Sequence, residues 1–229
     1  ELRNLIINNV KKIYINSLSS IRVFKKASVY PNILIVKEKD TFAEKLEVQI
    51  TSVQSELYLT DNNLVLNMRD IKLLPNYIFP INCSLGILKI FFKLSKIQKL
   101  SDILMIQEGL RIPPDLENND KGFHIVKQYQ FCRYSPITTG SFITEKDLTK
   151  CVSKTSSRFI NCNKDKIIFA EDALRIEAIL DNSNSLCQGG VYFATLLECT
   201  INLKFLLGLL NSKLLTCIYK NLFAGMHMG

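Results

Sequence analysis

The stretch LKFLLGLLNSKLLTCIYKNLF, from Leu203 to Phe223, has the clearest periodicity in the chain. Its apolar residues recur every three or four positions, at Leu203, Leu206, Leu207, Leu210, Leu214 and Ile218. This spacing gives a helix one apolar face, and Asn202 can cap its first turn. We therefore expect a long C-terminal helix. Inside it, Asn211 and Ser212 are expected to bond neighbouring backbone.

Four stretches upstream of this helix are rich in β-branched and aromatic residues, which favour strands. They are Phe123 to Phe131, Ser141 to Ile143, Ile167 to Ala170 and Gly190 to Leu197. The segment LGILKIFFKL, from Leu85 to Leu94, predicts a short helix with Lys89 and Lys93 on one side. The order of these elements indicates an α+β fold with mixed strands.

The first part of the chain predicts a helix followed by a hairpin. Glu1 to Lys12 has helical spacing of its apolar residues. Ile21 to Phe24 and Ser28 to Val36 are typical of the two strands of a hairpin. The pattern then weakens, apart from a strand at Leu46 to Val53. We expect the N-terminal part to span residues 1–40, a connector to span 41–84 and one domain to span 85–229.

Composition points to an ordinary globular protein. The 229 residues are 47% hydrophobic and 22% charged, and the apolar runs are too short to cross a membrane, which takes about 20 residues. Seven cysteines at irregular spacing form no Cys-x-x-Cys pair, so neither a zinc site nor a disulfide framework is expected. This cysteine usage fits a reducing cytoplasm.

The positive charge is concentrated in two parts of the chain. Lys and Arg against Asp and Glu number eight and three in residues 1–40, eight and ten in 41–120, ten and five in 121–175, and three and three in 176–229. The net charges are therefore +5, −2, +5 and 0, within a formal total of +8. Two basic blocks favour a polyanionic partner such as nucleic acid.

Motifs for catalysis are missing from the sequence. The nine glycines form neither a dinucleotide-binding nor a triphosphate-binding loop, and there is no Asn-Pro-Pro. His124 lies in an expected strand, where a structural imidazole is the simpler interpretation. We therefore expect no catalytic and no metal-binding residue. A metal-dependent nuclease assembled from dispersed acids, at Asp165, Glu171, Asp172 and Asp181, is kept as an alternative.

Five stretches follow one another in a recognisable order. They are IRVFKKASVYPNILIVKEK (Ile21 to Lys39), LSKIQKLSDILMIQEGLRIPPD (Leu94 to Asp115), FITEKDLTK (Phe142 to Lys150), DKIIFAEDALRIEAILDN (Asp165 to Asn182) and the C-terminal stretch quoted above. Together they resemble the TaqI-like C-terminal specificity domain, or target recognition domain, of type II restriction-modification enzymes and adenine-specific DNA methyltransferases. The first stretch resembles the last hairpin of a class I methyltransferase α/β sheet, and the fourth resembles a strand pair.

The resemblance implies a DNA specificity module preceded by a remnant of the methyltransferase sheet. In such enzymes the core binds S-adenosylmethionine and acts on a flipped adenine through an Asn-Pro-Pro-aromatic loop. This chain is expected to begin after that loop, as a fragment that holds no cofactor itself, while Mg²⁺ would serve a parent protein that also cleaves DNA. The expected partners are double-stranded DNA and the methyltransferase core of the same polypeptide. A type I restriction specificity subunit is the main alternative.

Eight basic residues are the candidates for DNA contact. Lys146, Lys150, Lys154 and Arg158 recur every fourth residue, so a single helix or strand would align them as a row facing phosphates. Arg111, Lys121, Lys127 and Arg133 lie around loops bounded by glycine and proline, where the resemblance implies the recognition contacts of the family.

Overall fold

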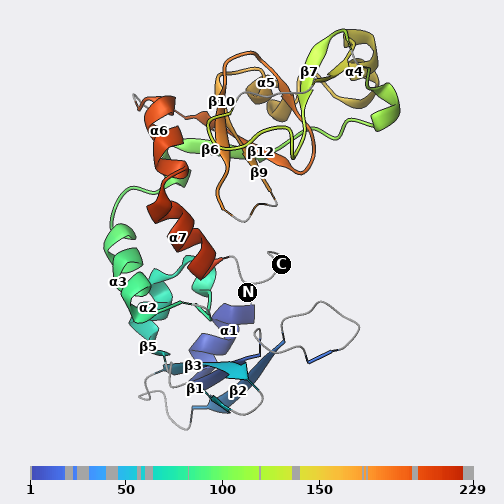
Figure 1. The fold of residues 1–229 in the computed structure, drawn as a ribbon. Coiled ribbons are helices and arrows are strands. Elements are labelled where there is room, and N and C mark those ends of the chain that lie inside the picture. Colours follow the sequence, from blue (N-terminus) through green and yellow to red (C-terminus); the bar gives the residue numbers. More distant parts are fainter. Residues whose placement is uncertain are drawn as a thin grey trace. The chain divides into compact units, whose positions relative to one another are not determined.

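The structure is a computed structural model. It describes residues 2–18, 23–24, 31–39, 46–55, 58–59, 64–81, 83–118, 120–135, 140–171, 173, 175–197 and 201–223. The chain divides into two compact units (Figure 1): unit 1 comprises residues 1–97 and 220–229, and unit 2 comprises residues 98–219. Each contains helices and mixed sheets, so the expected α+β class is confirmed.

Unit 1 is built on a five-stranded sheet in which β1 lies between β2 and β3. Its elements are α1 (Leu2–Asn9), β1 (Val10–Ser17), β2 (Asn32–Glu38), β3 (Glu47–Ser55), β4 (Tyr58–Leu59), β5 (Leu64–Asn67), α2 (Met68–Leu73), the 3₁₀ turn η1 (Pro75–Tyr77) and α3 (Leu85–Leu94). β1 pairs antiparallel with β2 and parallel with β3. The expected helix at Leu85 to Leu94 and strand at Leu46 to Val53 are confirmed as α3 and β3. Residues 41–84, expected to be a connector, supply β3, β4, β5 and α2.

The beginning of the chain differs from the expectation. The helix ends at Asn9, because the apolar period changes there from helical to alternating, with Ile13 and Ile15 buried in β1. β1 is then the first strand of the hairpin and pairs with β2. The expected strand at Ile21 to Phe24 is wrong where it is described, since Val23 and Phe24 lie outside any strand; Ile21, Arg22 and residues 28–30 lie outside the described residues.

Unit 2 contains a four-stranded and a three-stranded sheet. The four-stranded sheet has the order β10-β9-β12-β6 and the three-stranded sheet the order β11-β7-β8. The elements are η2 (Leu100–Asp102), β6 (Leu104–Glu108), η3 (Pro114–Leu116), β7 (Phe123–Val126), β8 (Ser141–Ile143), α4 (Glu145–Cys151), α5 (Ser157–Cys162), β9 (Lys166–Ala170), β10 (Ala178–Asp181), β11 (Leu186–Cys187), β12 (Val191–Leu196), α6 (Leu203–Leu210) and α7 (Lys213–Leu222). The last residues of α7 belong to unit 1.

Both faces of the four-stranded sheet are covered. Neighbouring residues of β9 point to opposite faces: Ile167 packs in a cluster with Leu206 of α6, whereas Ile168 packs in a cluster with Ile125 of β7 and Leu148 of α4. Both isoleucines are fully buried. The expected strands at 141–143, 167–170 and 190–197 are confirmed as β8, β9 and β12, and the strand pair of the fourth stretch as β9 and β10. The strand expected at 123–131 ends at Val126, where turns begin.

The C-terminal helix is confirmed in position but consists of two helices. Asn202 caps α6 by accepting a hydrogen bond from the backbone N–H of Lys204 at 2.8 Å. Helix α6 ends at Leu210 because Asn211 is buried and pairs with the backbone of Ala178, accepting from its N–H at 2.9 Å and donating to its carbonyl at 2.8 Å. The Ser212 hydroxyl then accepts from the N–H of Leu215 in the first turn of α7. The Asn-Ser pair therefore ends one helix and begins the next.

Candidate nucleic-acid interface

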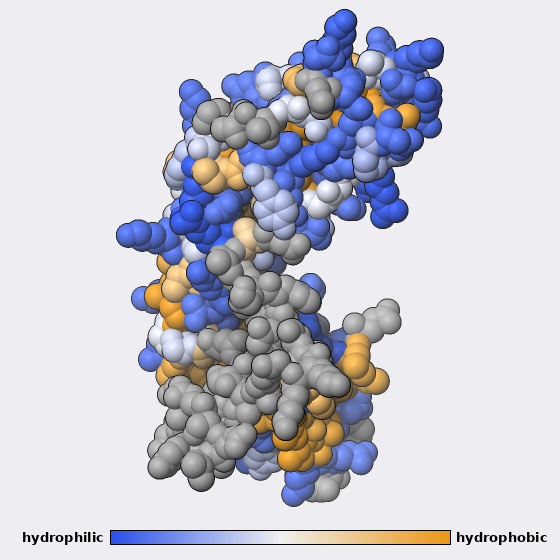
Figure 2. All heavy atoms as spheres, turned by 45° about the vertical axis from the view of Figure 1, so that its right-hand side comes forward, coloured by the Kyte–Doolittle hydropathy of each residue, from blue (hydrophilic) through white to orange (hydrophobic). Residues whose placement is uncertain are grey.

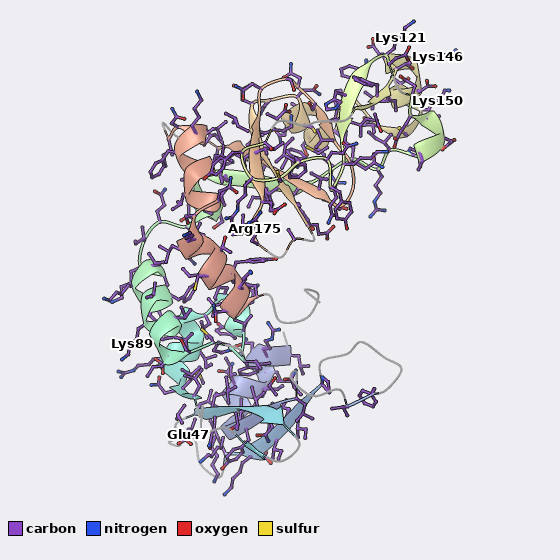
Figure 3. All side chains as sticks on the ribbon, in the orientation of Figure 1. Glu47, Lys89, Lys121, Lys146, Lys150 and Arg175 are labelled. Atoms are coloured by element: carbon purple, nitrogen blue, oxygen red, sulfur yellow. The ribbon has the colours of Figure 1, made fainter. Side chains whose placement is uncertain are left out.

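The pairing of β7 with β8 brings together Lys121 and Lys146, which lie far apart in the sequence. Phe123 pairs with Ile143, and Gly122 lies so close that an added Cβ would be 2.0 Å from the carbonyl oxygen of Ile143. Gly122 also has a φ of +111°, which favours glycine. Because α4 follows β8 directly, this approach places Lys121 at the beginning of α4. Figure 3 shows Lys121, Lys146 and Lys150 at the same end of unit 2.

Helix α4 presents two of the expected lysines. Thr144 caps it, accepting from the N–H of Asp147 at 3.2 Å. Lys146 and Lys150 are four residues apart and exposed, so they share a side of the helix. Lys150 bonds the Asp147 carboxylate at 2.6 Å, and this bond, with that of Thr144, lowers the pKa of Asp147.

The expected basic row is not formed by one element. α4 ends at Cys151, Lys154 lies in the following turn and Arg158 lies on α5, because Ser156 begins a second helix by accepting from the N–H of Phe159. The row of four is therefore wrong beyond Lys150. Lys154 pairs instead with Glu145, a contact that lowers the pKa of that carboxyl. The Arg158 guanidinium donates to the Gly109 carbonyl at 3.4 Å.

A second group of the expected residues surrounds Gln188. The backbone N–H of Gln188 donates to Val126 at 2.9 Å, and its side-chain amide donates to the Ile112 carbonyl at 2.8 Å. Arg111 therefore lies on a segment held beside the end of β7, from which Lys127 follows. Lys127 is half-buried and pairs with Glu117. Gly109 allows this packing, since an added Cβ would be 2.1 Å from the carbonyl oxygen of Gln188.

Arg133 is a structural tie within unit 2. It is half-buried, its Nε donates to the Ile176 carbonyl at 2.8 Å, and its guanidinium also bonds the Thr216 hydroxyl of α7. Of the eight expected residues, three are exposed and form no side-chain hydrogen bond or ion pair within the described part of the chain: Arg111, Lys121 and Lys146. Because phosphate contact requires an available cation, these three are the best placed of the eight.

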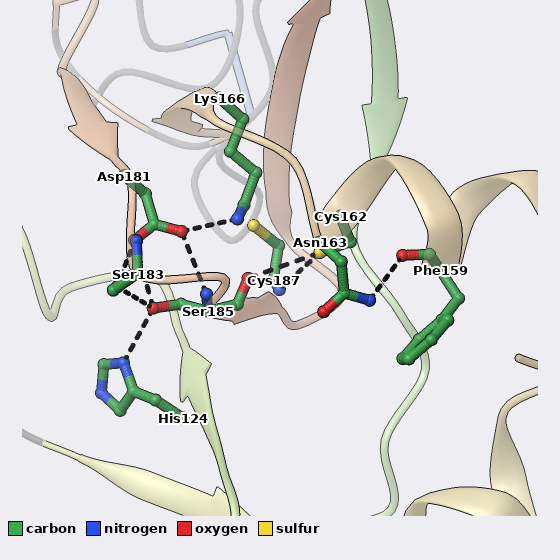
Figure 4. A network of polar contacts seen from close by, with 9 residues as sticks. All are labelled: His124, Phe159, Cys162, Asn163, Lys166, Asp181, Ser183, Ser185 and Cys187. Atoms are coloured by element: carbon green, nitrogen blue, oxygen red, sulfur yellow. Dashed lines mark hydrogen bonds and ion pairs between the residues drawn. The ribbon is translucent and has the colours of Figure 1, made fainter.

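A buried ion pair in unit 2 was not predicted from the sequence (Figure 4). Lys166 of β9 is fully buried and donates to Asp181 of β10 at 2.5 Å. The same carboxylate accepts from the hydroxyl of Ser183 at 2.5 Å and from the N–H of Ser185 at 3.1 Å. Ser185 in turn bonds Nδ1 of His124 on β7 at 3.2 Å. The network therefore links the two sheets of unit 2. One of them, through β7 and β8, positions the basic end of the unit, which carries Lys121, Lys146 and Lys150.

The ionisation of this network fits a structural role. Burial raises the pKa of the Asp181 carboxyl, but Lys166 and Ser183 outweigh it, so the pKa is lowered and the carboxylate stays charged. Beside the pair, the Sγ of Cys162 accepts from the N–H of Cys187 at 3.2 Å. Burial raises the pKa of the Cys187 thiol well above its ordinary value, so this thiol is a poor nucleophile.

The acidic residues considered for a metal-dependent nuclease do not form a metal site in the described part of the chain. Asp181 is committed to Lys166, and Asp172 lies outside the described residues. Among the residues that the structure does describe, no three His, Cys, Asp or Glu side chains come together as a metal site. Within the same part of the chain, no helix is long and apolar enough to span a membrane.

An α+β module with an exposed basic end defines a class of candidate nucleic-acid-binding domains. Comparison with protein families makes this specific: residues 125–227 match the TaqI-like C-terminal specificity domain. The suspected TaqI-like domain is therefore confirmed for residues 125–227, which contain three of the five stretches that carried the resemblance. Residues 21–39 and 94–115 lie outside the match. No curated protein matches the chain.

Proposed function

We propose that the chain recognises a specific sequence in double-stranded DNA for a restriction-modification adenine methyltransferase and is not itself catalytic. The match of residues 125–227 to the specificity domain carries this proposal. The exposed cations Arg111, Lys121 and Lys146 support it, since lysine and arginine contacts to phosphate supply most sequence-independent affinity for DNA. S-adenosylmethionine, and Mg²⁺ if the enzyme also cleaves, belong in this proposal to the rest of the enzyme.

The exposed aliphatic residues of strand β2 support the presence of a further layer of protein that packs against this strand. Its seven residues are all exposed, and the run Ile33, Leu34, Ile35 and Val36 is 48% to 54% exposed. Consecutive aliphatic residues are typical of strands that are covered on both faces. On the face that Figure 2 shows, hydrophobic side chains gather on unit 1, whereas the described side chains of unit 2 are mainly hydrophilic. We propose that the methyltransferase core of the same polypeptide covers β2.

DNA binding is tested by a salt series. Fluorescence anisotropy with the full chain and a mixed-sequence 30-base-pair duplex gives the slope of log affinity against log salt. Each lysine that meets a phosphate contributes about 0.9 to the slope, so the double variant Lys121→Ala/Lys146→Ala should flatten it by up to about 1.8. The control is Lys89→Ala/Lys93→Ala on α3, which is expected to leave the slope unchanged.

Two results would contradict the proposal. Absence of duplex binding at low salt would remove the DNA-binding function altogether. An unchanged slope in the Lys121/Lys146 variant would mean that the surface that contacts DNA phosphates does not include α4. The methyltransferase partner is tested separately: the gene upstream of the codon for Glu1 should encode an Asn-Pro-Pro-aromatic loop within about one domain length, roughly 100–150 residues.

A further inference from the structure

Two successive turns after β7 each carry a tyrosine at the third position. In Lys127–Gln130 the N–H of Gln130 donates to the Lys127 carbonyl at 3.3 Å, and in Cys132–Ser135 the N–H of Ser135 donates to the Cys132 carbonyl at 3.1 Å. The third residues, Tyr129 and Tyr134, have φ of 72° and 59°. This left-handed region favours glycine, and a bulky side chain in it is uncommon.

The tyrosines gain little from packing in return for this conformation. Tyr129 is 87% exposed and Tyr134 is 60% exposed. At the other described positions of unit 2 with positive φ the residues are Gly122, Gly190 and Asn184, and glycine and asparagine are the residue types that tolerate this region. A side chain that is strained and yet unpacked suggests that its ring is used outside the fold. The proposed DNA-binding function supplies such a use.

Hydrogen bonds and core packing hold the backbone of the two turns in place. The backbone N–H of Lys127 donates to Oε1 of Gln130 at 2.9 Å, and between the turns Phe131 is buried in the core cluster of unit 2. The N–H of Tyr134 donates to the Ala178 carbonyl at 3.3 Å, next to the Arg133 tie. A tyrosine on an ordered loop offers a large contact surface at a small cost in side-chain entropy.

We propose that Tyr129 and Tyr134 are specificity-determining residues that contact base edges of duplex DNA. This inference rests on the proposed function and assigns base reading to the two turns, while exposed lysines such as Lys121 and Lys146 hold the phosphates. The phenol hydroxyl can donate to or accept from a base edge in the major groove, and the ring can pack against the thymine methyl group.

The test uses the full chain and a duplex library with ten randomised base pairs. The wild-type chain should select a sequence motif. Tyr129→Gly and Tyr134→Gly should each lose preference at one or two positions of that motif by about 5- to 150-fold, the range of a base-edge contact. Both should keep the salt slope of the wild type and a midpoint of thermal unfolding at least as high, because glycine relieves the positive φ.

Three further variants sharpen the result. Tyr129→Asn and Tyr134→Asn keep a residue that tolerates the left-handed region, so the loss of preference should recur in them if a glycine variant folds poorly. Tyr77→Gly changes a tyrosine with a φ of 53° in unit 1 and should leave the motif unchanged. If the wild type selects a motif that every variant also selects with equal preference, the inference is overturned and the proposed function stands. If the wild type binds no duplex, or binds but selects no motif, both are overturned.

Discussion

Strand β2 of unit 1 and strand β9 of unit 2 both contain consecutive aliphatic residues, yet their surroundings differ completely. Ile167 and Ile168 of β9 are fully buried, on opposite faces of the sheet, by layers that unit 2 itself supplies. All of β2 is exposed. A run of aliphatic residues therefore indicates a strand suited to cover on both faces but does not say which part of a protein provides the cover.

The largest effect is expected from the lysines of these two strands. Replacing Lys166 of β9 with Met should lower the free energy of unfolding by about 3–5 kcal/mol, because Asp181 would stay buried without its counter-charge. The same change at the exposed Lys37 of β2 should stay within about 0.5 kcal/mol. Urea unfolding followed by circular dichroism measures both. Equal effects would mean that the buried ion pair does not stabilise unit 2.

Isoleucine truncation sharpens the same comparison. Ile168→Ala in β9 removes a fully buried side chain and should cost about 2–5 kcal/mol. Ile35→Ala in β2 removes a side chain that is 54% exposed and should cost less than about 1 kcal/mol. The measurement is again urea unfolding. A cost at Ile35 as large as that at Ile168 would show that β2 is covered in solution.

The junction between α6 and α7 should give an intermediate effect. Asn211→Ala removes both bonds to the backbone of Ala178. The buried N–H of Ala178 then loses its partner, whereas the carbonyl keeps the bond from the N–H of Tyr134, so we expect a cost of about 1–3 kcal/mol. Asn8→Ala on α1 removes an exposed side-chain bond to Asn4 and should change stability by less than about 0.5 kcal/mol. If the two variants unfold alike, Asn211 does not fix the end of α6.

These effects show what the sequence could and could not predict. The helix at Leu85 to Leu94 and the strands around residues 141, 167 and 191 were found because their periodicity or composition is local. The break at Asn211 was missed because it depends on Ala178, a residue of β10 that is distant in sequence. The extent of the first helix was missed because the apolar period changes from helical to alternating within a few residues of Val10.

The candidate site was predictable only as a composition of cations. Lys121 was identified from its loop position and Lys146 from the four-residue spacing of basic residues, and the structure places both at one end of unit 2. Arg133 was also a candidate, but whether an arginine is exposed or tied to a carbonyl depends on the tertiary fold. The exposed tyrosines at 129 and 134 gave a weak signal, because the sequence QYQFCRY resembles a strand and the positive φ of its turns is not encoded by glycine.

A pH series should show a smaller, graded effect in unit 2. The pKa of Asp181 is lowered in the folded state. The contribution of its carboxylate to stability is therefore complete above the pKa of the unfolded chain, about 3.9, and is lost as the pH falls through the lower folded pKa. The free energy of unfolding, measured from pH 6 to pH 2.5 in steps of about half a pH unit, should therefore decline below about pH 4. The variant Glu145→Gln/Asp147→Asn removes one exposed and one half-buried carboxyl of α4 and should keep most of the decline. If the decline disappears in this variant, Asp181 is not its source.

The smallest effect on stability, and the sharpest test of the exposed strand, is expected in β2 itself. Ile33 and Ile35 lie on one face of β2, and Leu34 and Val36 on the other. An edge strand with both faces apolar favours association, so the isolated chain should self-associate in sedimentation equilibrium. Either double lysine substitution, at 33 and 35 or at 34 and 36, should weaken association while changing the free energy of unfolding by less than about 0.5 kcal/mol per site.

Substitution tests β2 better than removal of residues 1–39 does, because removal would also take away β1, whose Ile13 and Ile15 are buried. The control is Leu2→Lys/Leu5→Lys on α1, where both leucines are more than half exposed, at 69% and 62%. If this control weakens association as much as the β2 variants do, general surface hydrophobicity drives association. If the wild type is monomeric at every concentration, β2 is already covered by the chain's own residues. Strands β2 and β9 would then both be covered by residues of this chain, and they would differ only in which segments cover them.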